Sequence, residues 1–142
     1  MKNDIDIDIT IPSHTRYLRM IGRIGEKVAE EIDCPDAIRE ALPDQLAIVL
    51  TEGLVNAIKH ANSADRDTEI HVRINVSKRV LVVRIYDNGL GFDLDAVPTP
   101  CFTSNGLEEK GRGIFILRSL MDTVKYSRSD DGNVLEMRKK LA

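Results

Sequence analysis

The sequence predicts an α/β fold, of the α+β type, in which one mixed, largely antiparallel sheet is covered on one face by about three helices. Two observations carry this prediction. Segments with apolar residues at every second position occur near both ends of the chain and in its middle, and the stretches between them have apolar residues at helical spacing. Sheet and helices can then bury one apolar face each, as in a two-layer sandwich. The 142 residues suffice for one domain, so we expect a single domain over 1–142.

The N-terminal segment 4–12, DIDIDITIP, alternates Asp with Ile and predicts a half-buried strand. We expect its acidic side to be solvated. An alternative is that this strand lies at a sheet edge and pairs with a second subunit, which its like charges would hinder unless the partner supplied Lys or Arg.

Two longer helices follow this strand. From Ser13, a candidate N-cap, apolar residues at helical spacing predict a helix that continues to about Ile32. A short helical piece ends at Leu42. Pro43 then precedes an apolar helix that runs to about Asn62, and proline is well tolerated at a helix start because its missing N–H would be unpaired there anyway.

Four further segments predict two hairpins: 68–77 with 79–87, and 123–129 with 133–141. The first pair is joined by a tight turn near Ser77 and Lys78, and the second pair turns at 130–132. Between the hairpins, residues 91–110 show little periodicity, which is typical of a functional lid or a disordered segment. A helix is expected to restart at Gly113.

The overall composition excludes several classes of protein. A net charge of -3 argues against nonspecific nucleic-acid binding, which needs a surplus of Lys and Arg. No apolar run approaches the roughly 20 residues of a membrane helix, and the acidic N-terminus does not resemble a signal peptide, so we expect a cytoplasmic protein. Cys34 and Cys101 lie far apart without a zinc-binding pattern, so we expect two free thiols.

Two pairs of glycines indicate that the backbone bends sharply or lies close to a ligand. Gly89 and Gly91 follow the strand that ends at Asp87, and Gly111 and Gly113 stand before a predicted helix. Neither pair extends to GxGxxG, and both the Walker P-loop and the eukaryotic protein-kinase signatures are absent. Unpaired N–H groups before a helix form an anion site. The alternative is that Gly113 merely eases entry into the helix.

A polar face interrupts the apolar helix that follows Pro43. Glu52 and Asn56 are four residues apart and therefore share one side of the helix. Burying a carboxylate and a carboxamide is costly unless they meet a metal, water or a ligand. The Asn oxygen suits Mg²⁺, and the Glu carboxylate suits a base. The alternative is that this face is simply exposed.

Three motifs, taken together and in this order, resemble those of the GHKL ATPase superfamily with its Bergerat fold. Within it, the chain is most similar to the anti-sigma-factor serine kinases of bacteria. TEGLVNAIKHAN resembles the N box, DNGLGFD the first glycine box and GRGIFILRSLMD the second. The similarity extends from the first strand to the last hairpin. It implies a Bergerat ATP-binding fold with an ATP lid.

The resemblance also implies a role for each motif residue. Asp87 would accept a hydrogen bond from the adenine amine, and Asn56 would hold Mg²⁺ at the phosphates. Glu52 would take the proton from an attacking hydroxyl. The glycine boxes would turn the chain under the base, open the lid and wrap the phosphates, with an arginine that adds charge or faces solvent: Gly89, Gly91, Gly111, Arg112 and Gly113.

Two positions depart from the family pattern. Ala61 stands where relatives usually have glycine, so the turn there is expected to differ. Gly132 is not followed by threonine, so a minor nucleotide contact through a hydroxyl is expected to be missing.

The function implied is that of a protein serine/threonine kinase that uses ATP and Mg²⁺. It would phosphorylate a serine on a STAS-domain anti-anti-sigma factor and sequester a sigma factor, as a homodimer that binds neither nucleic acid nor membrane. Glu52 favours this reading, since sensor histidine kinases usually carry Asn at that position. Two alternatives stay open: a nucleotide-binding interaction module without kinase activity, and a stand-alone histidine-kinase-type catalytic domain.

Overall fold

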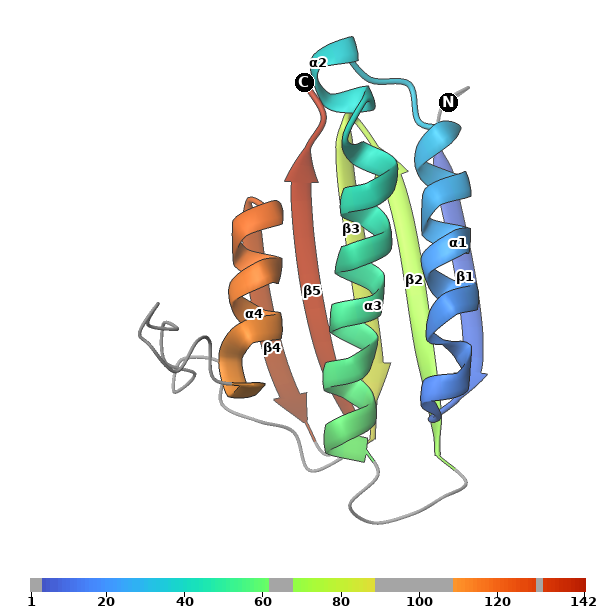
Figure 1. Ribbon diagram of the computed structural model, residues 1–142, viewed down its shortest axis with the longest axis vertical. Coiled ribbons are helices and arrows are strands. Elements are labelled where there is room, and N and C mark those ends of the chain that lie inside the picture. The colour runs from blue at the N-terminus through green and yellow to red at the C-terminus, as the bar shows by residue number, and fades with distance from the viewer. Residues whose placement is uncertain (1–3, 62–67, 89–108, 130–131) are drawn as a thin grey trace.

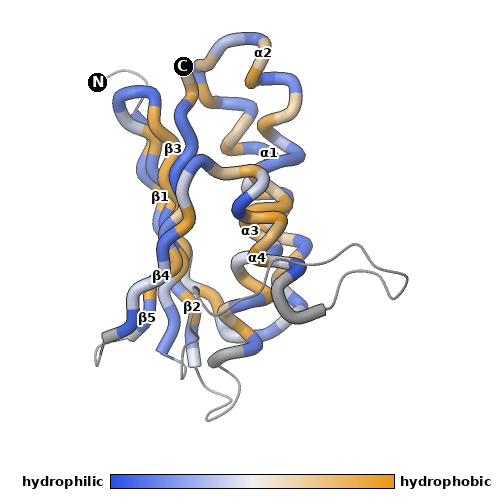
Figure 2. The backbone as a smooth tube through the Cα atoms, turned by 90° about the vertical axis from the view of Figure 1, so that its left-hand side faces the viewer, coloured by the Kyte–Doolittle hydropathy of each residue, from blue (hydrophilic) through white to orange (hydrophobic). Residues whose placement is uncertain are grey.

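The fold consists of two layers, a five-stranded sheet and a layer of helices on one of its faces (Figures 1 and 2). The computed structural model describes residues 4–61, 68–88, 109–129 and 132–142. Its elements are, in chain order, β1 (Ile5–Pro12), η1 (Thr15–Tyr17), α1 (Leu18–Glu30), α2 (Asp36–Arg39), α3 (Leu42–Ala61), β2 (Glu69–Ser77), β3 (Val80–Asp87), α4 (Glu109–Leu120), β4 (Thr123–Ser129) and β5 (Gly132–Lys140).

The sheet has the strand order β1-β2-β3-β5-β4, and every neighbouring pair of these strands is antiparallel. The fold class predicted from the sequence is confirmed, with a sheet that is antiparallel throughout the described strands rather than mixed. The chain starts and finishes at one end of the sheet, because Ile5 pairs beside the β2–β3 turn and Lys140 pairs with Val80. Asp87 lies at the opposite end of β3.

The core lies between the two layers, where the alternating apolar residues of the strands meet the helices. Figure 2 shows apolar stretches on the facing sides of sheet and helices. Helix α3 lies at the centre of the helical layer, and its residues Leu46, Leu50 and Leu54 are almost completely buried. A Cβ atom at Gly53 would lie only 2.5 Å from Cδ1 of Ile85. Glycine at this position therefore lets α3 pack closely on β3 near the end of the strand.

The outer face of the sheet is charged, and its charges are paired across strands. Asp6 of β1 accepts two hydrogen bonds from Arg73 of β2, at 3.0 and 2.9 Å. Asp8 contacts Nε2 of His71 at 2.8 Å. The expectation that the acidic side of β1 is merely solvated is therefore wrong, since two of its carboxylates pair with side chains of the same chain. As the alternative predicted, β1 is an edge strand; its pairing with a second subunit stays a prediction.

Three boundaries differ from the sequence predictions. The first helix begins with a 3₁₀ turn capped by the ring of His14, whose Nδ1 accepts a hydrogen bond from the Arg16 N–H at 3.0 Å. The turn between β2 and β3 falls on Lys78 and Arg79, which both have positive φ, as a type I′ hairpin turn requires. Helix α4 begins at Glu109, four residues before Gly113. Most of the predicted lid, 91–110, lies outside the described residues.

Candidate functional site

The predicted site residues belong to elements that meet at one end of the molecule. There β3 ends, β5 begins, α3 ends and α4 begins (Figure 1). Asp87 is the last residue of β3, Asn56 lies in the last two turns of α3, and Gly111 and Gly113 lie in the first turns of α4. Side chains from distant parts of the sequence are thus brought to the same end of the sheet.

Asp87 is buried, with 6% of its surface exposed, and it is the one charged residue that is buried in the described part of the chain. It lies directly opposite Asn133 in the β3–β5 ladder. The Asn133 amide donates a hydrogen bond from Nδ2 to Oδ1 of Asp87 at 2.9 Å, and Asn133 is itself only 5% exposed. A buried carboxylate is costly without such donors. The sequence indicates only that position 133 is not threonine, and it did not predict that Asn133 lies opposite Asp87, which follows from the register of β3 and β5.

Gly132 allows this approach of β5 to β3. Its φ of +135° lies in a region that L side chains rarely adopt. A Cβ atom at this position would lie 2.7 Å from Oδ1 of Asn88 and 3.0 Å from the carbonyl oxygen of Asp87. The glycine therefore lets β5 begin tightly against the end of β3.

Asn56 and Asp87 lie at the same end of the fold, because α3 and β3 run toward that end from a common contact (Figure 1). That contact joins Gly53 to Ile85. Asn56 is three residues further along the helix, about 4.5 Å, and Asp87 is two residues further along the strand, about 6.8 Å. Nδ2 of Asn56 is buried and has no hydrogen-bond partner among the described residues.

The orphaned Asn56 amide provides a test of whether the site fits a bound group. A buried polar atom without a partner costs about 1–3 kcal/mol, which a ligand or water at this position would recover. Its carboxamide also supplies the hard oxygen that Mg²⁺ prefers. Within the part of the chain that the structure describes, no three His, Cys, Asp or Glu side chains gather into a metal-binding cluster. The orphaned Nδ2 is a donor and therefore fits an acceptor such as a ligand oxygen or water, whereas Oδ1 of the same side chain is the atom that could hold a cation.

Glu52 lies one turn before Asn56, on the side of α3 that contacts α4. A Cβ atom at Gly113 would lie 2.9 Å from Oε2 of Glu52, closer than real Cβ contacts come. Glycine at 113 therefore makes room for the Glu52 carboxylate, which is partly exposed and can reach solvent. This role was not among the interpretations of Gly113 drawn from the sequence, and its contact with phosphates stays a prediction.

The expectation that Gly111 and Gly113 precede the helix is wrong, because α4 already includes both. The first four N–H groups of a helix have no intrahelical partner, so Gly111 retains an unpaired position and Gly113 does not. Arg112 is exposed, and its role as an added charge at the phosphates stays a prediction. Gly89 and Gly91 lie outside the described residues, so their roles stay predictions.

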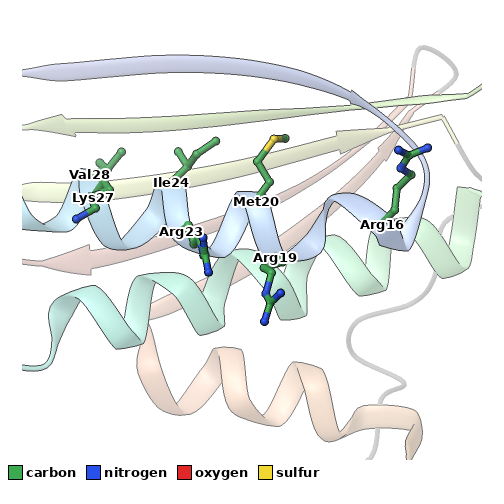
Figure 3. A pocket seen from close by; sticks show the side chains of 7 residues that line it. All are labelled: Arg16, Arg19, Met20, Arg23, Ile24, Lys27 and Val28. Carbon is green, nitrogen blue, oxygen red and sulfur yellow. The ribbon is translucent and has the colours of Figure 1, made fainter.

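A second surface, well separated in sequence from these motifs, lies on α1 and is called the α1 surface here. Met20, Ile24 and Val28 follow one another along one side of the helix, with Arg19 and Arg23 on another side (Figure 3). They line a shallow hollow of about 560 Å³. Met20 is 44% exposed, and neither arginine forms an ion pair with any residue that the structure describes.

Two further expectations concern cysteines and membranes. Cys34 is a buried free thiol, whereas Cys101 lies outside the described residues. No helix in the described ranges is both long and apolar enough to cross a membrane.

Comparison with known proteins agrees with the motifs. Residues 11–139 match the family model of the histidine kinase-like ATPase domain. The serine-protein kinase RsbW of Bacillus subtilis is 31% identical over 133 residues, covering 88% of this chain and 80% of that protein. The protein of the same name from Bacillus velezensis is 30% identical over 149 residues, covering 99% and 89%.

One solved structure shows the same fold. It contains the RsbU and RsbW domains of a Mycobacterium tuberculosis protein and matches 96% of this chain with a TM-score of 0.62 at 11% identity. The present chain corresponds to 32% of that longer polypeptide. The fold is therefore shared at a level of sequence identity that says nothing about activity.

Proposed function

This chain belongs to the histidine kinase-like ATPase domain family, and from that premise we propose that it transfers the γ-phosphoryl group of ATP to a serine of a partner protein. Relatives at about 30% identity that carry the name serine-protein kinase support the proposal. The observation that carries it is the position of Glu52, a partly exposed carboxylate of α3 that lies against Gly113 of α4, one turn from Asn56.

In this proposal the buried Asp87 at the end of β3 binds the adenine base. Asp87 accepts a hydrogen bond from the adenine amine. Asn56 holds Mg²⁺, which neutralises charge on the phosphates when bound. The first turn of α4 carries the positive end of a helix dipole and binds phosphate oxygens through its backbone, with Arg112 as an added charge. The proposed set is completed by the glycines Gly89, Gly91, Gly111 and Gly113.

Phosphoryl transfer then needs positioning, charge neutralisation and one proton acceptor. The serine Oγ attacks the γ-phosphorus while its proton passes to the Glu52 carboxylate. The bond between the γ-phosphorus and the β–γ bridging oxygen breaks, and ADP leaves with that oxygen and its electron pair. The products are phosphoserine and ADP. Glu52 then returns its proton to water, which its partial exposure permits.

We further propose that the substrate is a STAS-domain anti-anti-sigma factor, that the unphosphorylated form competes with a sigma factor for this protein, and that the kinase acts in the cytoplasm as a homodimer. The α1 surface supports docking of a protein partner. Its exposed Met20, together with Arg19 and Arg23, which form no ion pair with any described residue, suits a partner segment that carries acidic side chains beside apolar ones. We assign the STAS-domain partner to this surface.

The test is phosphoryl transfer from radiolabelled ATP to STAS-domain proteins of the same genome. We expect acid-stable label on serine with the wild type. Glu52→Gln should bind ATP normally yet lose transfer by at least about a hundredfold, since the base is used only in the transition state. Glu40→Gln is the matched control, because Glu40 is exposed and precedes the opposite end of α3.

Two results would contradict the proposal. One is a partner that binds the ATP-loaded protein and never acquires label, which would favour an interaction module. The other is label that persists in Glu52→Gln or is lost in acid, which would favour different chemistry.

A further inference from the structure

The pairing of Asp87 with Asn133 carries an inference beyond the roles proposed above. The two side chains are opposite each other on neighbouring strands, both are at least nine-tenths buried, and Nδ2 of Asn133 donates to Oδ1 of Asp87 at 2.9 Å. The sequence suggested that a hydroxyl donor is missing after Gly132. The structure shows that position 133 does supply a donor, an amide N–H in place of a hydroxyl.

The hydrogen bond restricts how the carboxylate is oriented. Rotation about the terminal χ angle of Asp is broad and has no sharp preference of its own, so an external contact must set the plane of the two oxygens. Asn133 is held in a strand whose start is fixed by the close contact of Gly132 with β3. A donor attached to such a rigid element fixes one carboxylate oxygen and thereby the direction of the other.

The chemistry of the donor also matters. An amide donates without carrying a charge, so it does not neutralise Asp87 as Lys or Arg would. An ionised carboxylate is acceptor-only. The Asp87 carboxylate can therefore bind a base edge that carries an amine donor. A base edge that carries a keto oxygen would instead place a second acceptor against the carboxylate, which is unfavourable. The pair is thus suited to recognise an aminopurine such as adenine.

We propose that Asn133 is a positioning residue for base recognition, which holds the Asp87 carboxylate in the orientation that accepts the exocyclic amine of adenine. The inference rests on the proposed ATP site and adds a residue that determines its specificity. It concerns binding only and does not depend on kinase activity.

The test compares two ligands that differ only at the amine. ATP and purine ribonucleoside triphosphate, which has hydrogen in place of the 6-amino group, are titrated into the full chain by calorimetry. A hydrogen bond to a charged acceptor predicts roughly tenfold or greater preference of the wild type for ATP. Asn133→Val should reduce this preference severalfold by weakening ATP binding alone. Asn133→Thr, which has nearly the shape of Val and restores a donor, should recover at least part of it.

Each outcome decides the matter. Loss of the preference in Asn133→Val with recovery in Asn133→Thr supports the inference, because a merely structural role would weaken both ligands equally. An unchanged preference in Asn133→Val overturns it while leaving the ATP site intact. A wild type that binds ATP without preferring it over the analogue removes the role of Asp87, and a wild type that binds neither ligand removes the proposed function as well.

A second matched pair guards against misfolding. If thermal melting shows that Asn133→Val is unfolded, Asn133→Ser and Asn133→Ala differ by one hydroxyl and make the same comparison in a smaller side chain. We expect Asn133→Ser to keep a preference for ATP and Asn133→Ala to lose it. Equal preferences in these two variants would overturn the inference.

Discussion

Replacing Gly113 with alanine should slow phosphoryl transfer about ten- to hundredfold while leaving the fold nearly unchanged and weakening ATP binding far less than transfer. The new Cβ would lie 2.9 Å from Oε2 of Glu52, whereas ordinary contact begins near 3.4 Å, so the carboxylate must move by about 0.5 Å or more. A displacement approaching 1 Å of a reacting group costs on the order of a hundredfold in rate. The effect on catalysis should therefore be large although the change is one methyl group.

The free energy of unfolding should change little, for two opposing reasons. Alanine in a helix interior is favoured over glycine by about 1 kcal/mol. The carboxylate is the end of a flexible side chain and can rotate away, which offsets part of this gain. Stability should thus stay within about 1 kcal/mol of the wild type, as measured by thermal or urea unfolding.

The assay is single-turnover transfer to the proposed STAS-domain partner, with ATP affinity measured separately. Gly22→Ala is the matched control, because its Cβ would also be tight, at 3.2 Å from Cγ2 of Thr51, but lies in α1. If Gly113 acts through Glu52, combining Gly113→Ala with Glu52→Gln should be no slower than Glu52→Gln alone. Wild-type turnover in Gly113→Ala, or additive losses in the double variant, would refute this reasoning.

Two further predictions concern the metal and the partner. Asn56→Ala should abolish most of the gain in ATP affinity that Mg²⁺ provides, because the one proposed protein ligand is lost; titrations with Mg²⁺ and with EDTA check this, and an unchanged gain would exclude the ligand role. Arg19→Glu with Arg23→Glu should weaken binding of the proposed STAS-domain partner at least tenfold in low salt without altering ATP affinity. Unchanged partner binding in this double variant would show that the partner does not dock on the α1 surface.

Regular patterns within single elements could be predicted from the sequence. The alternation of Ile and Asp in residues 4–12 gave β1, and the apolar spacing around Glu52 and Asn56 gave α3, because period and burial coincide in each. The resemblance to the GHKL superfamily is confirmed by the family match over 11–139. Both kinds of signal depend on the order of residues along the chain and not on which segments meet in space.

What could not be predicted depends on contacts between distant segments. Glycines are unfavourable in helices, so placing Gly111 and Gly113 before α4 followed local propensity; close contact with Glu52 outweighs that propensity at 113. Asn133 meets Asp87 only through the register of β3 and β5, which no local pattern specifies. The pairing of Asp6 with Arg73 depends in the same way on strands that are far apart in the chain.

The placement of β1 and β5 has a practical consequence for experiments on this protein. Val80 pairs with Lys140, so it lies at the end of the sheet where the outer ends of β1 and β5 are found. Asp87 is seven residues further along β3, which corresponds to about 24 Å. An affinity tag, a fluorophore or a surface tether joined to either terminus is thus attached at the pole remote from the proposed nucleotide site. Protein immobilised through its N-terminus should bind ATP with the same affinity as protein immobilised through its C-terminus, so either terminus can carry the attachment in the titrations above.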